Sequence, residues 1–239
     1  MSSKVASDPH DPLNQNAVYV FEAPVRLWHW LHTLSFLALA VTGYLIANPL
    51  PSLSGEASDH FMMGNIRLIH FISAYVFAIG FVVRIYWALV GNHYAREIFY
   101  LPFWRPSWWK GLFYQIRFYL FLTRKQHKTL GHNALAQVAM FLLNTLGTVF
   151  MIATGFALYG EGLGTGSWAD NWFGWIIPIL GGSEATHNWH NMGMWVMLTF
   201  VIIHIYMAVR ADIIGRESSV STIIGGWRTR LRTINLDKR

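Results

Sequence analysis

The stretch HNMGMWVMLTFVIIH, residues 190–204, is apolar and carries a histidine at each end. Fourteen residues are close to four α-helical turns, so His190 and His204 should project from nearly the same face, about 21 Å apart along the axis. A histidine inside a membrane span is costly and indicates a functional site. Two on one face, one toward each side of a bilayer, favour two stacked cofactors over one.

The composition is that of an integral membrane protein. Of the 239 residues, 54% are hydrophobic and 13% are charged, whereas a soluble domain usually has about a quarter charged residues. The chain has no cysteine, which excludes disulfides, thiolate metal sites and iron–sulfur clusters held by the chain itself. A redox metal would therefore have to be held by histidine, methionine or carboxylate.

Four apolar stretches are long enough to cross a hydrocarbon core of about 30 Å. They cover residues 28–46, 66–90, 135–159 and 189–209. No sequence repeat or low-complexity segment divides the chain, so we predict a single membrane domain over residues 1–239. The predicted fold class is an all-α integral membrane protein, built as a bundle of four transmembrane helices.

Basic residues predict how this bundle sits in the membrane. The loop at 91–133 contains one acid, Glu97, and all its other charged residues are basic. These are Arg96, Arg105, Lys110, Arg117, Arg124, Lys125 and Lys128. The tail at 210–239 is also basic, whereas the connections at 48–65 and 160–188 contain no Lys or Arg. The positive-inside rule then places both termini, the loop and the tail in the cytoplasm.

This topology, together with contact to anionic lipid, explains the basic charge of the chain, so we expect a lipid bilayer and no nucleic acid as partner. The loop at 91–133 is also rich in tryptophan and tyrosine. We predict an interfacial helix there, and a second interfacial segment near residues 172–180 at the opposite side.

Depth in the membrane sorts the histidines into two pairs. The fourth helix runs inward, so His190 lies at an outer level and His204 at an inner level. The second helix also runs inward and carries His70 near its outer end, which pairs it with His190. The first helix runs outward and carries His29 and His32 at its inner end. Either one can pair with His204, because residues three apart share a side of a helix.

Paired histidines at two levels suit haem iron. Two axial imidazoles leave no open position for oxygen, so such a centre is suited to electron transfer. Zinc is disfavoured because two ligands at each level cannot complete a tetrahedron. The alternatives are a hydrogen-bonding role in helix packing for any single histidine, and a proton relay for the set.

Two arginines on the second helix are candidate partners of haem propionates. Arg84 follows His70 by fourteen residues and so lies on the same face at the inner level. Arg67 lies one turn outside His70 and could serve an outer haem in the same way, or could be an interfacial side chain that reaches the headgroups. Seven small residues are candidates for close backbone approach to a flat cofactor: Gly43, Ser73, Ala74, Gly80, Gly147, Gly155 and Gly193.

Several motifs resemble those of one family. RLWHW (26–30), IRLIH (66–70), GHN (131–133) and HNMGMW (190–195), with His204, are similar to the b-type cytochrome subunit of membrane-bound Ni/Fe-hydrogenases. VFEAP (20–24) and FMIATGFALYG (150–160) resemble it too, so the resemblance covers about residues 19–226. The wider set of dihaem four-helix membrane cytochromes, including formate dehydrogenase subunits, shares the histidine plan but not these loops.

The resemblance implies two b-type haems, with His29 rather than His32 as the fourth ligand. It implies an electron-transfer subunit that is no enzyme on its own, in the respiratory chain of a bacterial inner membrane. Its partners would be the large (Ni–Fe) and small (Fe–S) hydrogenase subunits on the periplasmic side, which it would help to anchor. Electrons would pass from the outer level to the inner level and on to a quinone.

By analogy with related cytochromes, His132 and Asn133 are candidates for the quinone site, although Asn133 could equally be a helix N-cap. Two other functions remain open. One is a dihaem quinone-linked cytochrome of a formate dehydrogenase or related reductase. The other is a proton-coupled transporter that uses the same histidines as a relay.

Overall fold

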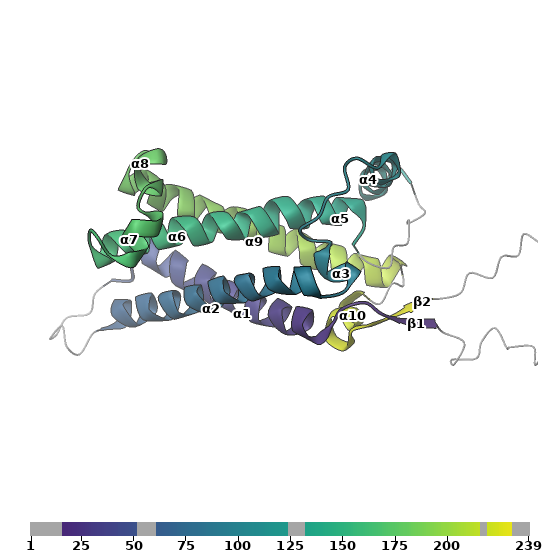
Figure 1. Ribbon diagram of the computed structural model, residues 1–239, viewed down its shortest axis with the longest axis horizontal. Coiled ribbons are helices and arrows are strands. Elements are labelled where there is room, and N and C mark those ends of the chain that lie inside the picture. The colour runs from purple at the N-terminus through teal and green to yellow at the C-terminus, as the bar shows by residue number, and fades with distance from the viewer. Residues whose placement is uncertain (1–15, 52–60, 124–131, 216–218, 231–239) are drawn as a thin grey trace, which may run out of the picture.

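The computed structural model describes residues 16–51, 61–123, 132–215 and 219–230, and these form an elongated helical bundle (Figure 1). Its long helices are α1 (Ala23–Ala47), α2 (Met62–Val90), α6 (Gly147–Leu163) and α9 (Ser183–Gly215). Within the described residues, four helices are long and apolar enough to cross a membrane. The predicted membrane bundle is therefore confirmed.

The observed spans are longer than the predicted ones, because the helices continue past the apolar stretch into polar sequence. The third span runs from Ala134 to Leu163 and is not uniform. It begins as α5 (Ala134–Ala139), widens into a π-helical segment, η3 (Met140–Leu146), and continues as α6. Pattern analysis did not predict this segment, because π-helical turns have no periodic signature of their own and are rare.

The surface of the bundle is adapted to lipid. Large apolar side chains point outward from every span, including Leu34, Ile79 and Ile202, each more than half exposed. Threonines lie inside instead, and Thr148 and Thr154 are almost completely buried between helices. Since lipid tails are as apolar as leucine, small and polar residues pack the interior while leucine and isoleucine face the membrane.

The two ends of the bundle differ in charge, and we call them the basic end and the acidic end. The basic end carries α3 (His93–Arg96), α4 (Pro106–Tyr119) and α10 (Ser219–Gly225). The acidic end carries α7 (Trp168–Phe173) and α8 (Ile176–Ile179), with Glu161, Asp170 and Glu184 nearby in sequence. Among the predicted loop cations, Arg124, Lys125 and Lys128 lie outside the described residues.

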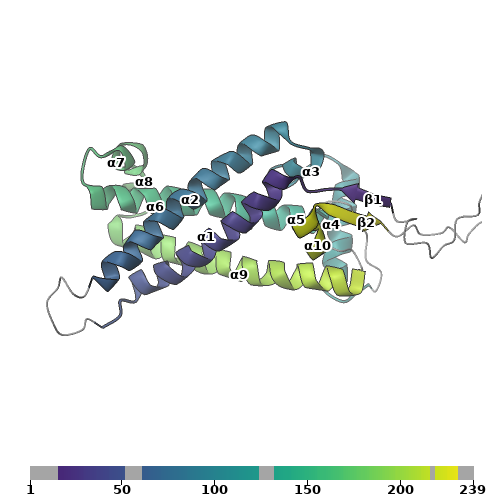
Figure 2. The same cartoon turned by 90° about the horizontal axis from the view of Figure 1, so that it is seen from below.

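A short sheet joins the two ends of the chain. β1 (Asn16–Tyr19) pairs antiparallel with β2 (Trp227–Arg230), with Val18 opposite Arg228, so these distant segments lie side by side at the basic end (Figures 1 and 2). Neither strand was predicted, because four residues are too few for an alternating pattern and each strand depends on a partner about two hundred residues away.

The predicted interfacial helix is present as α4, which lies across the bundle axis (Figures 1 and 2). Arg210 near the end of α9 holds it in place: its guanidinium lies 4.8 Å from the ring centre of Phe118 and 4.7 Å from that of Phe121. The predicted segment near 172–180 forms the end of α7 and all of α8. Contact of either with headgroups stays a prediction.

Candidate functional site

Two histidines in the part of the bundle nearer the acidic end are each held by a threonine of a neighbouring helix. Thr42 on α1 places its Oγ1 2.9 Å from Nδ1 of His70 on α2. Thr154 on α6 places its Oγ1 2.8 Å from Nδ1 of His190 on α9. A Cβ at Gly43 would lie 3.3 Å from Cε1 of His70 and 3.8 Å from Sδ of Met194, which is one turn after His190 on α9. The structure therefore places His70 beside the turn of α9 that follows His190, and their pairing on one cofactor stays a prediction.

The threonine contacts determine which ring nitrogen carries the proton. Each hydroxyl has one hydrogen and donates it to a carbonyl one turn back, Thr42 to Ala38 at 2.6 Å and Thr154 to Phe150 at 2.8 Å. Each threonine oxygen must then accept from the Nδ1–H of its histidine. Nε2 keeps its lone pair in both rings, and this is the nitrogen that remains free to bind a metal.

A glycine follows each of these threonines and lets the ring come close. A Cβ at Gly43 would lie 3.3 Å from Cε1 of His70, and a Cβ at Gly155 would lie 3.2 Å from Cε1 of His190. Both distances are shorter than ordinary van der Waals contact. Two Thr-Gly pairs, on α1 and on α6, thus form matching cradles for the two imidazoles, and both glycines were predicted as close-approach positions.

Nearer the basic end, the structure brings His29 and His204 together. Their ring centres are 6.4 Å apart, and His204 stacks on Phe200. An imidazole nitrogen binds a metal at about 2 Å and lies about 1.1 Å from its ring centre, so two rings on one ion would have centres about 6.2 Å apart. The observed separation of the ring centres is close to that value, so it is compatible with one metal ion held by both rings.

His32 is placed differently from His29. Its ring stacks on Phe77 at 4.1 Å and lies 4.7 Å from Trp28. Both of its nitrogens are buried without a hydrogen-bond partner among the described residues. The geometry supports His29 over His32 as the partner of His204, in agreement with the resemblance, and the ligand role itself stays a prediction.

Arg84 is a buried cation whose guanidinium is only partly hydrogen-bonded within the described residues. It is 2% exposed, its Nη2 donates to the carbonyl of Ala95 at 2.6 Å, and its guanidinium lies 5.2 Å from the Trp28 ring and 5.3 Å from that of Phe99. Within the described residues its Nε and Nη1 are buried without a partner. A buried guanidinium in this condition is suited to an anion.

Arg67 differs, because its side chain is exposed on α2 and no contact fixes it in the described structure. Its predicted propionate role therefore has no structural support and stays a prediction. His187 is also exposed, and its Nδ1 lies 2.9 Å from the carbonyl oxygen of Ser183. His187 therefore belongs to the surface and not to the paired histidines.

The donor set fits haem. Paired imidazoles, two glycine cradles and a buried arginine with open donors suit a flat, anionic iron group that takes two imidazoles from the protein. No group of three or more metal-binding side chains occurs within the described ranges.

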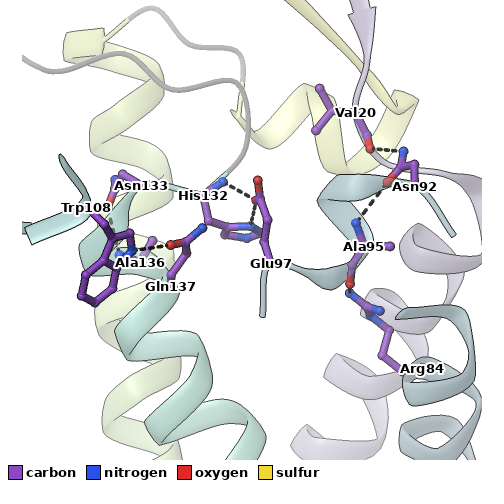
Figure 3. A network of polar contacts seen from close by, with 10 residues as sticks. All are labelled: Val20, Arg84, Asn92, Ala95, Glu97, Trp108, His132, Asn133, Ala136 and Gln137. Atoms are coloured by element: carbon purple, nitrogen blue, oxygen red, sulfur yellow. Dashed lines mark hydrogen bonds and ion pairs between the residues drawn. The ribbon is translucent and has the colours of Figure 1, made fainter. Parts of the chain in front are cut away.

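A cavity of about 600 Å³ lies at the basic end, with His132 in its wall. The backbone N–H of His132 donates to Oε2 of Glu97 at 2.7 Å, and the Nδ1 of its ring lies 2.9 Å from the same oxygen (Figure 3). Asn133 accepts from the backbone N–H of Ala136 at 2.9 Å, so the N-cap interpretation of Asn133 is confirmed. The rings of His29 and His204 are within electrostatic reach of His132.

Sequence reasoning missed Glu97 as a site residue and counted it only as a charge. The available signal was that it is the sole acid in a loop of basic residues. A single carboxylate among so many cations in the sequence is a candidate for a specific ionic contact. That contact is with His132, thirty-five residues further along the chain.

Comparison with known proteins places these residues in a wider context. The family model for prokaryotic cytochrome b561 matches residues 20–226. A protein of Azotobacter chroococcum named probable Ni/Fe-hydrogenase B-type cytochrome subunit is 56% identical, over 90% of this chain and 89% of its own length. A protein of the same name from Cupriavidus necator is 52% identical, over 89% of this chain and 87% of its own. A similarly named Escherichia coli protein is 50% identical, over 88% of this chain and 90% of its own.

Proposed function

Because the chain belongs to the prokaryotic cytochrome b561 family, we propose that it is the b-type cytochrome subunit of a Ni/Fe-hydrogenase. In this role it carries electrons from hydrogen oxidation to a membrane quinone and helps to anchor the hydrogenase. The names of its relatives support this assignment. The observation that carries it is the placement of histidines at two levels, with His29 and His204 6.4 Å apart at one level and with His70 and His190 each held by a threonine at the other.

Two b-type haems, held by His70 with His190 and by His29 with His204, would supply reversible one-electron transfer. The chain's own residues hold and orient them. Thr42 and Thr154 fix the ring tautomers by accepting from Nδ1–H. The open donors of Arg84 would bind a propionate at the inner level, and Arg67 is the candidate for the outer level.

The acidic end would face the periplasm and dock the hydrogenase. This end carries Glu161, Asp170 and Glu184, while Trp172 and Trp175 belong to the segment predicted to lie at the headgroups beside it. The small iron–sulfur subunit would contact this surface and carry the large Ni–Fe subunit.

The basic end would face the cytoplasm of a bacterial inner membrane, as the positive-inside rule requires. Quinone would be reduced there, close to the inner histidine pair, with His132 in its site. The cap contact of Asn133 uses its side-chain oxygen and leaves its amide N–H groups to the site. Hydrogen oxidation outside and proton uptake inside make the inward electron transfer electrogenic.

Optical titration of the complex purified with its hydrogenase tests this function. We expect two b-type haems per chain, both with bis-histidine spectra, both reduced by hydrogen and both reoxidised by added quinone. If hydrogen reduces the haems but added quinone does not reoxidise them, quinone is not the electron acceptor of this protein. A chain without a b-haem spectrum would support a histidine relay in a transporter instead.

A further inference from the structure

The segment that carries Glu97 is fixed on both sides. Before it, the Ala95 carbonyl accepts from Arg84 at 2.6 Å and the Ala95 N–H donates to the Asn92 side chain at 3.0 Å. After it, the Ile98 carbonyl accepts from Thr145 in the π-helical segment at 3.1 Å. Glu97 is 8% exposed, so its carboxylate is buried at a defined place rather than carried on a free loop (Figure 3).

One oxygen of this carboxylate makes both contacts with His132. Oε2 accepts the backbone N–H at 2.7 Å and faces Nδ1 of the ring at 2.9 Å. In the neutral ring the proton therefore sits on Nδ1, and Nε2 is the nitrogen left to exchange protons. When Nε2 takes a proton, the pair becomes an ion pair, and the carboxylate compensates the new charge.

Polar and titratable side chains make up most of the wall of the cavity beside this pair. Its wall at the basic end contains His93, Arg96 and Arg105 in addition to Glu97 and His132. The charged and titratable groups near His132 are the Glu97 carboxylate, which contacts it, these cations of the cavity wall, and the rings of His29 and His204, which are within electrostatic reach. His132 therefore lies in the cavity wall and within electrostatic reach of the inner histidine pair.

We propose that His132 donates the protons that complete quinone reduction, and that Glu97 is its positioning residue. This rests on the proposed quinone reduction. A quinone becomes a quinol by taking up two electrons, which hydrogen oxidation supplies, and two protons. For each proton, the Nε2–H bond of His132 breaks, an O–H bond forms on the quinone, and Nε2 is reprotonated by water of the cavity.

The test compares Glu97→Gln with Glu22→Gln in the purified complex. The amide introduced by Glu97→Gln keeps an oxygen that can accept both N–H groups but removes the charge. Glu22 is a matched control at the same end, since its Oε2 accepts from Trp87 Nε1 at 3.0 Å and from the Asn92 N–H at 2.9 Å, and it is absent from the cavity wall.

With a short-chain ubiquinone as acceptor, Glu97→Gln should slow hydrogen-driven quinone reduction about tenfold or more at pH 8, with partial recovery at lower pH and a larger rate effect of D2O. Glu97→Asp should recover part of the rate. Haem content, haem reduction by hydrogen, and binding of a fluorescent quinolinol N-oxide should stay as in the wild type. Glu22→Gln should match the wild type throughout.

An unchanged quinone rate and pH profile in Glu97→Gln overturns this inference alone. Slower haem reduction by hydrogen in that variant also overturns it, because the role would then be structural. A wild-type complex whose haems are reduced by hydrogen but which reduces no quinone overturns the proposed function, and the inference with it.

Discussion

Thr42 holds His70 across the interface of two helices, with its Oγ1 2.9 Å from the Nδ1 of the ring. Thr154 holds His190 in the same manner. The threonine hydroxyl is committed to its own helix, so the imidazole must donate. This leaves Nε2 as the nitrogen available to a metal, and the basicity of such a ligand would depend on a threonine that does not touch the metal.

Replacing Thr42 with Val keeps the shape of the side chain and removes the acceptor for His70. The ring then loses electron density, which disfavours oxidised iron, so the midpoint potential of the outer haem should rise. One buried hydrogen bond is worth about 1 kcal/mol, which corresponds to a shift on the order of tens of millivolts for a one-electron couple. A redox titration measures this shift.

The control for that titration is Thr42→Ser, which keeps the hydroxyl and should keep the wild-type potential. The inner haem serves as an internal reference in both variants. If Thr42→Val and wild type titrate identically, Thr42 does not tune His70.

A methyl group at Gly155 should displace His190, because its Cβ would lie 3.2 Å from Cε1 of the ring. We expect Gly155→Ala to lose most of the outer haem and so to retain about half of the total haem per chain. Gly162→Ala on the same helix is the matched control, since nothing lies within 4 Å of its added Cβ. The measurement is the amount of extracted haem per chain. A full complement of haem in Gly155→Ala would contradict the claim that Gly155 makes room for His190.

Substitution of Arg84 tests whether its unpaired N–H groups bind a haem propionate. Arg84→Gln removes a buried positive charge, so an uncompensated propionate would favour oxidised iron and lower the midpoint potential of the inner haem.

Arg67→Gln is the parallel test at the outer level. A fall of the outer potential would support the propionate role of Arg67, whereas an unchanged potential would assign it to the interface. Both potentials come from one spectroelectrochemical titration.

His29 and His32 can be separated by two substitutions. His29→Ala should abolish the inner haem signal and leave the outer one. His32→Phe should retain both haems, since its ring already stacks on Phe77 at 4.1 Å and needs no hydrogen bond there. Removing two buried nitrogens that lack partners among the described residues should also raise stability by about 1–3 kcal/mol. Haem spectra with thermal denaturation of the complex check both statements, and loss of the inner haem in His32→Phe would reverse the assignment.

Much of the fold followed from local pattern. The number of spans depends on apolar length, and that length can be counted along the chain. The longer observed ends and the π-helical turn at Met140–Leu146 did not follow, because helix ends depend on capping and on neighbouring chain as well as on hydropathy. The pairing of β1 with β2 did not follow either, since it joins opposite ends of the chain.

For the site, the sequence by itself predicted His70, His190 and His204 at two depths, with either His29 or His32 as the fourth histidine, and placed Arg84 on the face of His70. Helical spacing and membrane depth are properties of one helix at a time, so they can be read without a partner. Only the tertiary structure showed that His29, and not His32, lies beside His204. Only the tertiary structure showed that Thr42 contacts His70, that Thr154 contacts His190, and that Glu97 contacts His132. These contacts depend on how far each helix is rotated about its axis and how closely it packs, and that is fixed by all the helices together.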